Sequence, residues 1–98
     1  MNLNVLVHGL KFLEVTGYYE GKDKFTGMLG GIIVDFNGVE VRVGGGYTEQ
    51  QRKDLWEIRD QLLGRIAEVK YMELTNSNPP SLRHPIFLRF RDYKSEKC

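Results

Sequence analysis

The sequence has little of what disulfides, metal sites and membrane spans require. Its 98 residues include one cysteine, Cys98, and two histidines, His8 and His84. A single cysteine cannot form an internal disulfide, and no Cys/His spacing suits zinc. No run of about 18 apolar residues occurs, so we expect no membrane span. These absences favour a protein of the reducing interior of a cell.

Net charge is also small, at +1, but it is unevenly spread. Residues 1–47 and 48–82 each carry one more acidic than basic side chain, whereas residues 83–98 carry five basic and two acidic ones. Local electrostatic potential, rather than net charge, attracts an anionic partner, so the basic residues at 83–98 matter more than the net charge of the chain. A chain of this length, 41% hydrophobic and 28% charged, can bury one core, so we expect one domain.

Alternating apolar residues predict five strands. Asn37-Gly38 is the strongest hairpin signal, because both positions of such a turn need positive φ. The polar stretch at 18–26 predicts a loop, and Gly9 is expected to bend the first strand. The expected strands are Leu3–Val15, Met28–Phe36, Val39–Val43, Arg65–Leu74 and Ile86–Arg91.

One helix is expected between the third and fourth strands. Thr48 with Gln51 fits the capping box, in which each side chain satisfies a free backbone N–H of the other residue. Apolar residues then recur at helical spacing at Leu55, Ile58 and Leu62. The order of elements predicts a mainly β protein, a five-stranded Greek-key OB-fold barrel with one α-helix between strands 3 and 4. An SH3-like barrel also has five strands but rarely carries such a helix.

The last strand is unusually basic. Strict alternation would place one set of residues in the core and the other outside: Ile86, Leu88 and Phe90 against Phe87, Arg89 and Arg91. Guanidinium groups suit bidentate contacts with phosphate. Arginine stems also cover the exteriors of barrels. A phosphate-binding strand and a solvated one therefore both stay open at this point.

Three segments carry a family resemblance: VGGGYTEQQRKDLWE, GRIAEVKYMELT and LRHPIFLRFRDYK. They resemble the C-terminal OB domain of ATP-dependent DNA ligases, and the likeness covers nearly the whole chain. The closing segment is similar to the RxDK motif of that family, with Arg91 and Lys94 at its Arg and Lys. Tyr93 stands at the acidic position of the motif and Asp92 precedes it. In an extended segment this shift turns the carboxylate to the opposite side.

The resemblance implies a single OB domain over residues 1–98, a C-terminal fragment of a larger ligase without its adenylation domain. No KxDG motif occurs, so the lysine that such ligases adenylate is missing and the chain alone should be inactive. The family implies that Arg91 and Lys94 orient ATP for enzyme adenylation and that the domain clamps nicked duplex DNA. The candidate DNA-binding cations are Lys22, Lys24, Arg42, Lys70, Arg83 and Arg89.

The implied partners are nicked double-stranded DNA and the adenylation domain of the same ligase, with no membrane. We expect a monomer. ATP and Mg²⁺ are implied for the full-length enzyme, and no cofactor or metal is expected on this domain alone. The implied setting is the cytoplasm of a prokaryote or of a virus-infected cell, or a nucleus, with roles in DNA replication, repair and recombination.

Three other functions fit the same fold. A free-standing OB module that binds single strands would need several exposed aromatics on strands two and three, where Phe36 is the only one. The OB domain of an mRNA capping enzyme is related, but the LRHPIF stretch and the helix favour a ligase. An OB domain with only a protein-interaction role stays open, because fold alone does not fix function.

Overall fold

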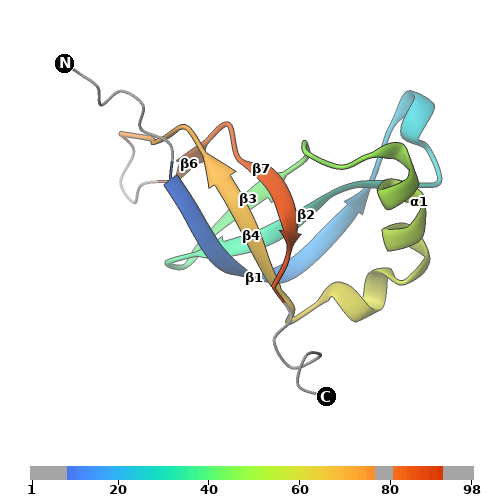
Figure 1. The fold of residues 1–98 in the computed structure, drawn as a ribbon, viewed down its shortest axis with the longest axis horizontal. Helices are drawn as coiled ribbons and strands as arrows, with labels where there is room; N and C mark the ends of the chain where they lie inside the picture. Colours follow the sequence, from blue (N-terminus) through green and yellow to red (C-terminus); the bar gives the residue numbers. More distant parts are fainter. Residues whose placement is uncertain (1–8, 77–80, 92–98) are drawn as a thin grey trace.

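The computed structural model describes residues 9–76 and 81–91. Five strands form one antiparallel sheet in the order β3-β2-β1-β4-β7, and β5 pairs with β6 in a separate ribbon. The helix α1 lies at one end of the molecule, and the β5–β6 ribbon lies toward the other (Figure 1). The elements are β1 (Gly9–Glu20), the 3₁₀ helix η2 (Asp23–Phe25), β2 (Leu29–Phe36), β3 (Val39–Val43), α1 (Glu49–Glu57), the 3₁₀ helix η3 (Arg59–Leu62), β4 (Ile66–Tyr71), β5 (Glu73–Leu74), β6 (Leu82–Arg83) and β7 (Ile86–Phe90).

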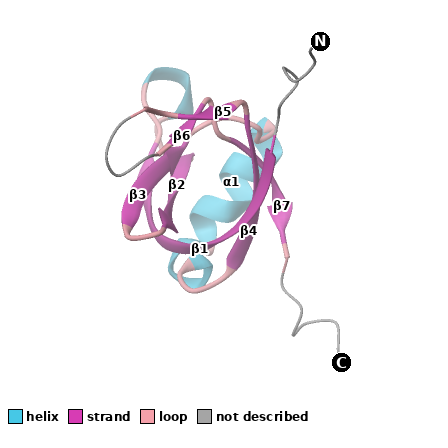
Figure 2. Cartoon of the chain, turned by 90° about the vertical axis from the view of Figure 1, so that its left-hand side faces the viewer, coloured by secondary structure: helices cyan, strands magenta, loops and turns pink. Residues whose placement is uncertain are grey.

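The five-stranded sheet curls into a barrel, with β2 and β3 on one side and β4 and β7 on the other (Figure 2). Its edge strands meet at the glycine loop after β3, where the Phe87 N–H donates to the Gly45 carbonyl at 2.9 Å. Gly46 must be glycine there, since its φ is +101° and a Cβ would collide with the Phe87 carbonyl. The predicted OB-fold, with one helix between β3 and β4, is confirmed.

Two local predictions are also confirmed. Asn37 and Gly38 have φ values of 54° and 88°, as a two-residue hairpin requires. At the start of α1, Thr48 Oγ1 accepts a hydrogen bond from the Gln51 N–H, and Gln51 Oε1 accepts one from the Thr48 N–H, at 3.0 and 2.9 Å. The helix ends earlier than the apolar spacing suggests, because Leu62 lies in η3. Within the described ranges no helix is long and apolar enough to cross a bilayer.

The first and fourth strands differ from their predictions. β1 continues through Tyr18–Glu20, which was expected to be loop, because Tyr18 packs against the core and its hydroxyl donates to Asp60 at 2.6 Å. The pairing of β1 with β2 is irregular at Thr16, and Gly9, the first described residue, pairs with Tyr71. The fourth strand breaks between β4 and β5, and the partner strand β6 was not predicted. The expected residues 3–8 of the first strand lie outside the described ranges.

The predicted faces of the last strand are wrong for Ile86 and Phe87, whereas Arg89 is exposed and Phe90 packs against the core as expected. Arg89 and Phe87 pair with consecutive residues of β4, so Leu88 is an extra residue and forms a β-bulge. The bulge puts Phe87 in the core, 2% exposed, and leaves Ile86 outside, 40% exposed. Strict alternation assumes regular pairing, and one extra residue exchanges the faces of everything beyond it.

The buried Arg52 of α1 ties the helix to the barrel. Its guanidinium donates to the carbonyls of Leu29, Gly30 and Gly44 at 3.0, 2.9 and 3.1 Å. Nearby, the Tyr47 hydroxyl donates to a carbonyl at the end of β3 at 2.6 Å, and burial raises the pKa of this phenol. The helix is therefore fixed over the ends of β2 and β3.

The hydrophobic core of the barrel consists of Val15, Leu29, Ile32, Val34, Phe36, Val41, Val43, Leu62, Ala67, Val69, Leu82 and Phe87.

The bulge predicts unequal costs for truncating two neighbouring residues. Phe87→Ala should lower the free energy of unfolding by about 3–5 kcal/mol, because it opens a cavity in the core. Ile86→Ala should lower it by less than about 1 kcal/mol, because that side chain is already hydrated. Urea unfolding of the 98-residue chain, followed by circular dichroism, measures both. A larger loss of stability for Ile86→Ala than for Phe87→Ala would contradict the bulge and support regular alternation in the last strand.

Candidate functional site

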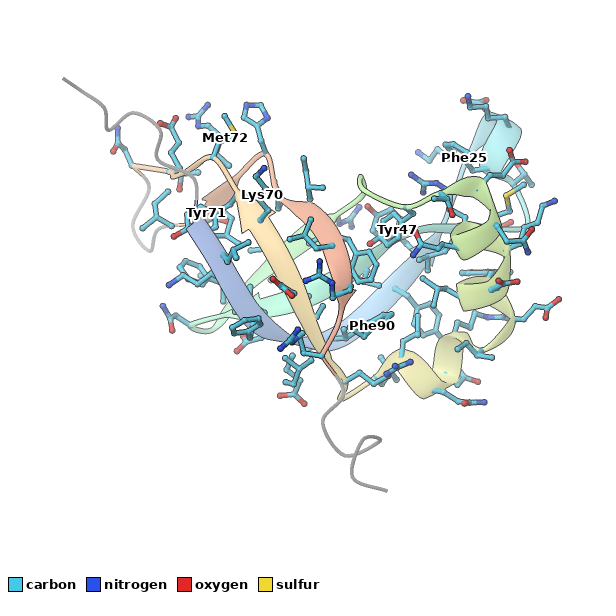
Figure 3. The ribbon with its side chains drawn as sticks, in the orientation of Figure 1. Phe25, Tyr47, Lys70, Tyr71, Met72 and Phe90 are labelled. Carbon is cyan, nitrogen blue, oxygen red and sulfur yellow. The ribbon has the colours of Figure 1, made fainter. Side chains whose placement is uncertain are left out.

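One outward surface of the barrel combines exposed apolar and basic side chains. We call it the β7 face. It consists of two cross-strand rows from β1, β4 and β7: Leu10, Lys70 and Ile86, then Phe12, Glu68 and Arg89. Leu10, Phe12 and Ile86 are all exposed. Figure 3 labels Lys70 on β4 beside Tyr71 and Met72. Exposed apolar residues rimmed by charge are typical of a surface that contacts a partner.

Glu68, at the centre of the β7 face, is only 6% exposed. Its Oε1 accepts a hydrogen bond from Arg89 Nη1 at 2.6 Å and lies 3.8 Å from Arg91 Nη1. A carboxylate taken out of water needs partners of opposite charge, and two guanidinium groups supply them. Arg91 also lies 5.7 Å from the Phe12 ring centroid, and its backbone N–H donates to the Ile66 carbonyl at 2.7 Å.

A second surface lies across the barrel, and we call it the β3 face. Half-buried Tyr19 lies over glycine backbone there: a Cβ added at Gly44 would come within 2.8 Å of its hydroxyl oxygen, and one at Gly31 closer still. The guanidinium carbon of Arg42 lies 5.3 Å from the Tyr19 ring centroid. The glycines keep this surface flat beneath one aromatic ring and one cation. The β3 face consists of Gly17, Tyr19, Gly31, Ile33, Arg42 and Gly44, from β1, β2, β3 and the loop after β3.

Two of the predicted DNA-binding cations, Lys70 and Arg89, lie together on the β7 face, beside Arg91. Arg83 lies on the β5–β6 ribbon, where its Nε is 2.9 Å from a carboxylate oxygen of Glu73. Both groups of that pair are exposed, so water screens their attraction. The structure thus gathers three predicted site residues on one face and sets Arg83 apart from them.

The other predicted cations in the described residues lie on other elements. Arg42 is on the β3 face, and the exposed Lys22 and Lys24 are on the η2 loop that joins β1 to β2. That loop joins two of the strands that form the β3 face. Lys94 and the reversed pair Asp92-Tyr93 lie outside the described residues.

Sequence reasoning missed the two side chains that organise these faces. Glu68 had a weak signal, since it is an acidic residue inside the otherwise apolar start of β4. Tyr19 had none, because its place depends on glycines of two other strands. No three His, Cys, Asp or Glu side chains come together as metal ligands in residues 9–76 and 81–91.

Comparison with known proteins identifies the relatives of this chain. The model of the DNA ligase OB-like domain family matches residues 20–91. The structure named Pmar-Lig_PreS3 is 33% identical over 87% of this chain, with a TM-score of 0.78. A structure of Lig E DNA ligases, described as binding DNA with a minimal scaffold, is 28% identical over 87%, with a TM-score of 0.72. Chlorella virus DNA ligase-adenylate, 24% identical over 86% with a TM-score of 0.73, shares the fold.

This chain spans only 21%, 31% and 30% of those three chains, respectively. No curated protein matches it. The likeness is therefore to one domain of longer proteins.

The two Arg–Glu pairs predict a contrast in stability. Glu68→Ala should lower the free energy of unfolding by about 2 kcal/mol, less than breaking a fully buried pair, because Arg89 stays hydrated. Glu73→Ala removes an exposed pair and should cost less than about 0.5 kcal/mol. Urea unfolding of the 98-residue chain compares them. Equal losses of stability in the two variants would contradict the conclusion that Glu68, unlike Glu73, forms its ion pair while buried.

Proposed function

The chain belongs to the DNA ligase OB-like domain family, and we propose that it is the domain of an ATP-dependent DNA ligase that clamps nicked duplex DNA and orients ATP. The observation that carries the proposal is the presence of two separate basic surfaces on one barrel, one on β1, β2 and β3 and the other on β1, β4 and β7. The strands β2 and β3 lie on the opposite side of the barrel from β4 and β7 (Figure 2). A ligase domain that meets DNA in one step and a nucleotide in another needs two such surfaces. The nucleotidyltransferase domain, with its KxDG lysine, belongs to the part of the ligase outside this chain.

The β3 face is the surface for DNA in this proposal. Tyr19 lies flat over Gly31 and Gly44, which leaves a surface without protruding side chains there, and Arg42 with the loop lysines Lys22 and Lys24 supplies positive charge. Contacts of this kind go to phosphates, so binding depends on salt and not on base sequence. Tyr19 presents a single ring, which can pack against a sugar.

The β7 face serves the nucleotide step. Arg91 and Lys94 orient the triphosphate of ATP so that pyrophosphate leaves in line with the attacking lysine, which is electrostatic positioning rather than covalent chemistry. Lys70 and Arg89 add positive charge on the same face. The complete ligase, and not this domain alone, holds ATP with Mg²⁺. Because one lysine must be adenylated elsewhere, the isolated chain seals no nicks.

Two opposite faces imply a moving domain. The β7 face turns toward the nucleotidyltransferase domain for adenylation, and the β3 face turns toward the nicked duplex for sealing. We place the ligase inside a cell, acting as a monomer in DNA replication, repair and recombination. Arg83, already paired with Glu73, stays a candidate contact in the DNA-bound arrangement.

Single-strand binding, the main alternative, has less support. Base stacking on an OB-fold needs several exposed aromatic rings. Phe36, the only aromatic of β2 and β3, is buried in the core, and Tyr19 is the only aromatic of the β3 face. A surface with one ring suits duplex backbone better than a run of unstacked bases.

Binding of nicked duplex by the 98-residue chain should be weak and steeply dependent on salt. With about three phosphate contacts, affinity should fall about 40-fold between about 50 and 200 mM salt. Arg42→Ala should reduce the slope of log affinity against log salt concentration by about 0.9, the value for one phosphate contact. Lys53→Ala, which removes an exposed lysine of α1, should leave this slope unchanged. Fluorescence anisotropy measures the affinity of the parent chain and of both variants at each salt concentration. Preference for single strands, or equal effects of both variants, would exclude the duplex clamp at the β3 face.

Arg91→Ala, in the ligase that joins this domain to its nucleotidyltransferase domain, should slow enzyme adenylation by about 100-fold or more. Sealing of nicks that already carry AMP should change by less than about twofold, because that step does not need the triphosphate. Single-turnover assays separate the two steps. Equal losses in both would reject the role of Arg91 in the nucleotide step.

A further inference from the structure

Arg91 is held by two side chains that the proposed function does not yet use. Its guanidinium lies 3.8 Å from the buried carboxylate of Glu68 and 5.7 Å from the centroid of the exposed Phe12 ring. These contacts come from β4 and β1, and the backbone of Arg91 is itself hydrogen-bonded to β4. The side chain therefore starts from a fixed base between two neighbours.

Stability alone does not account for a carboxylate at this position. Replacing a buried ion pair by apolar residues is often neutral or stabilising, and exposed apolar side chains already surround Glu68 on the β7 face. The consequence that an apolar residue could not reproduce is electrostatic. An anion beneath Arg89 and Arg91 draws both guanidinium groups to one place on the sheet.

Arg89 and Arg91 lie at different distances from Glu68 Oε1, 2.6 and 3.8 Å. Arg89 donates a short hydrogen bond to Glu68, whereas Arg91 lies beyond hydrogen-bond distance of the same oxygen. A Coulomb attraction at this range restricts where Arg91 points without fixing its N–H groups in a directional bond to Glu68. Glu68 therefore influences the direction of Arg91 by its charge and not by a short hydrogen bond.

We propose that Glu68, assisted by Phe12, is a positioning residue that holds Arg91 ready for a polyphosphate on the β7 face. The proposal rests on the proposed function, because it assigns Glu68 an effect only through Arg91. Holding a cation near its working position lowers the entropy lost when the triphosphate arrives. Glu68 touches neither nucleotide nor DNA in this role.

The test is Glu68→Gln in the ligase that contains this domain, since glutamine keeps the shape of the side chain and can still accept from Arg89. Enzyme adenylation should slow about tenfold, and sealing of pre-adenylated nicks should change by less than about twofold. Phe12→Leu, an exposed substitution that cannot disturb the core, should slow adenylation about twofold to threefold with sealing unchanged. Glu57→Gln, at an exposed position of α1, should leave both steps unaltered.

A double variant separates positioning from structure. If Glu68 acts through Arg91, then Arg91→Ala with Glu68→Gln should be no slower in adenylation than Arg91→Ala alone. The proposal would be overturned if the double variant slowed adenylation by the product of the two single effects. It would also be overturned if Glu68→Gln slowed adenylation and sealing equally. If Arg91→Ala itself is not selective for adenylation, the proposed function fails. If it is selective and neither Glu68→Gln nor Phe12→Leu is, only this inference fails.

Discussion

One extra residue in β7 decides which side chains of the last strand face the solvent. With Leu88 outside the regular pairing, Phe87 points into the barrel, and its ring stacks on Tyr47 with centroids 4.8 Å apart. The next paired residue, Arg89, then lies opposite Glu68 on the outside. The contact that closes the barrel, from Phe87 to the glycine loop, depends on the same register. Core, closure and charged face therefore rest on a single bulge.

A net charge of +1 conceals two basic surfaces. On the β7 face the cations converge on one buried carboxylate, which offsets part of their charge and fixes their direction. On the β3 face the cation lies over a tyrosine ring and has no acidic partner among the described residues. A focused pair suits a compact, highly charged group such as a triphosphate, whereas a flat cationic surface suits an extended phosphate backbone. This difference in electrostatics underlies the division of labour that we propose.

Features fixed by adjacent residues could be predicted from the sequence. The Asn37-Gly38 turn and the capping box at Thr48 involve only neighbours in the chain, and the order of elements identified the OB-fold. Features that depend on cross-strand register could not. The bulge at Leu88 exchanged the expected faces of Ile86 and Phe87, and the contacts of Glu68 join strands far apart in sequence. The cations of the last strand were thus identified by type, but their partners and directions needed the fold.

The central claim, that DNA and nucleotide use opposite faces, is tested most directly by a titration of the ¹⁵N-labelled chain with nicked duplex. We expect the backbone amide signals of Gly31, Arg42 and Gly44 to shift as duplex is added, while those of Val69 and Arg89 stay in place. Shifts confined to Val69 and Arg89, on β4 and β7, would contradict the separation of the two faces.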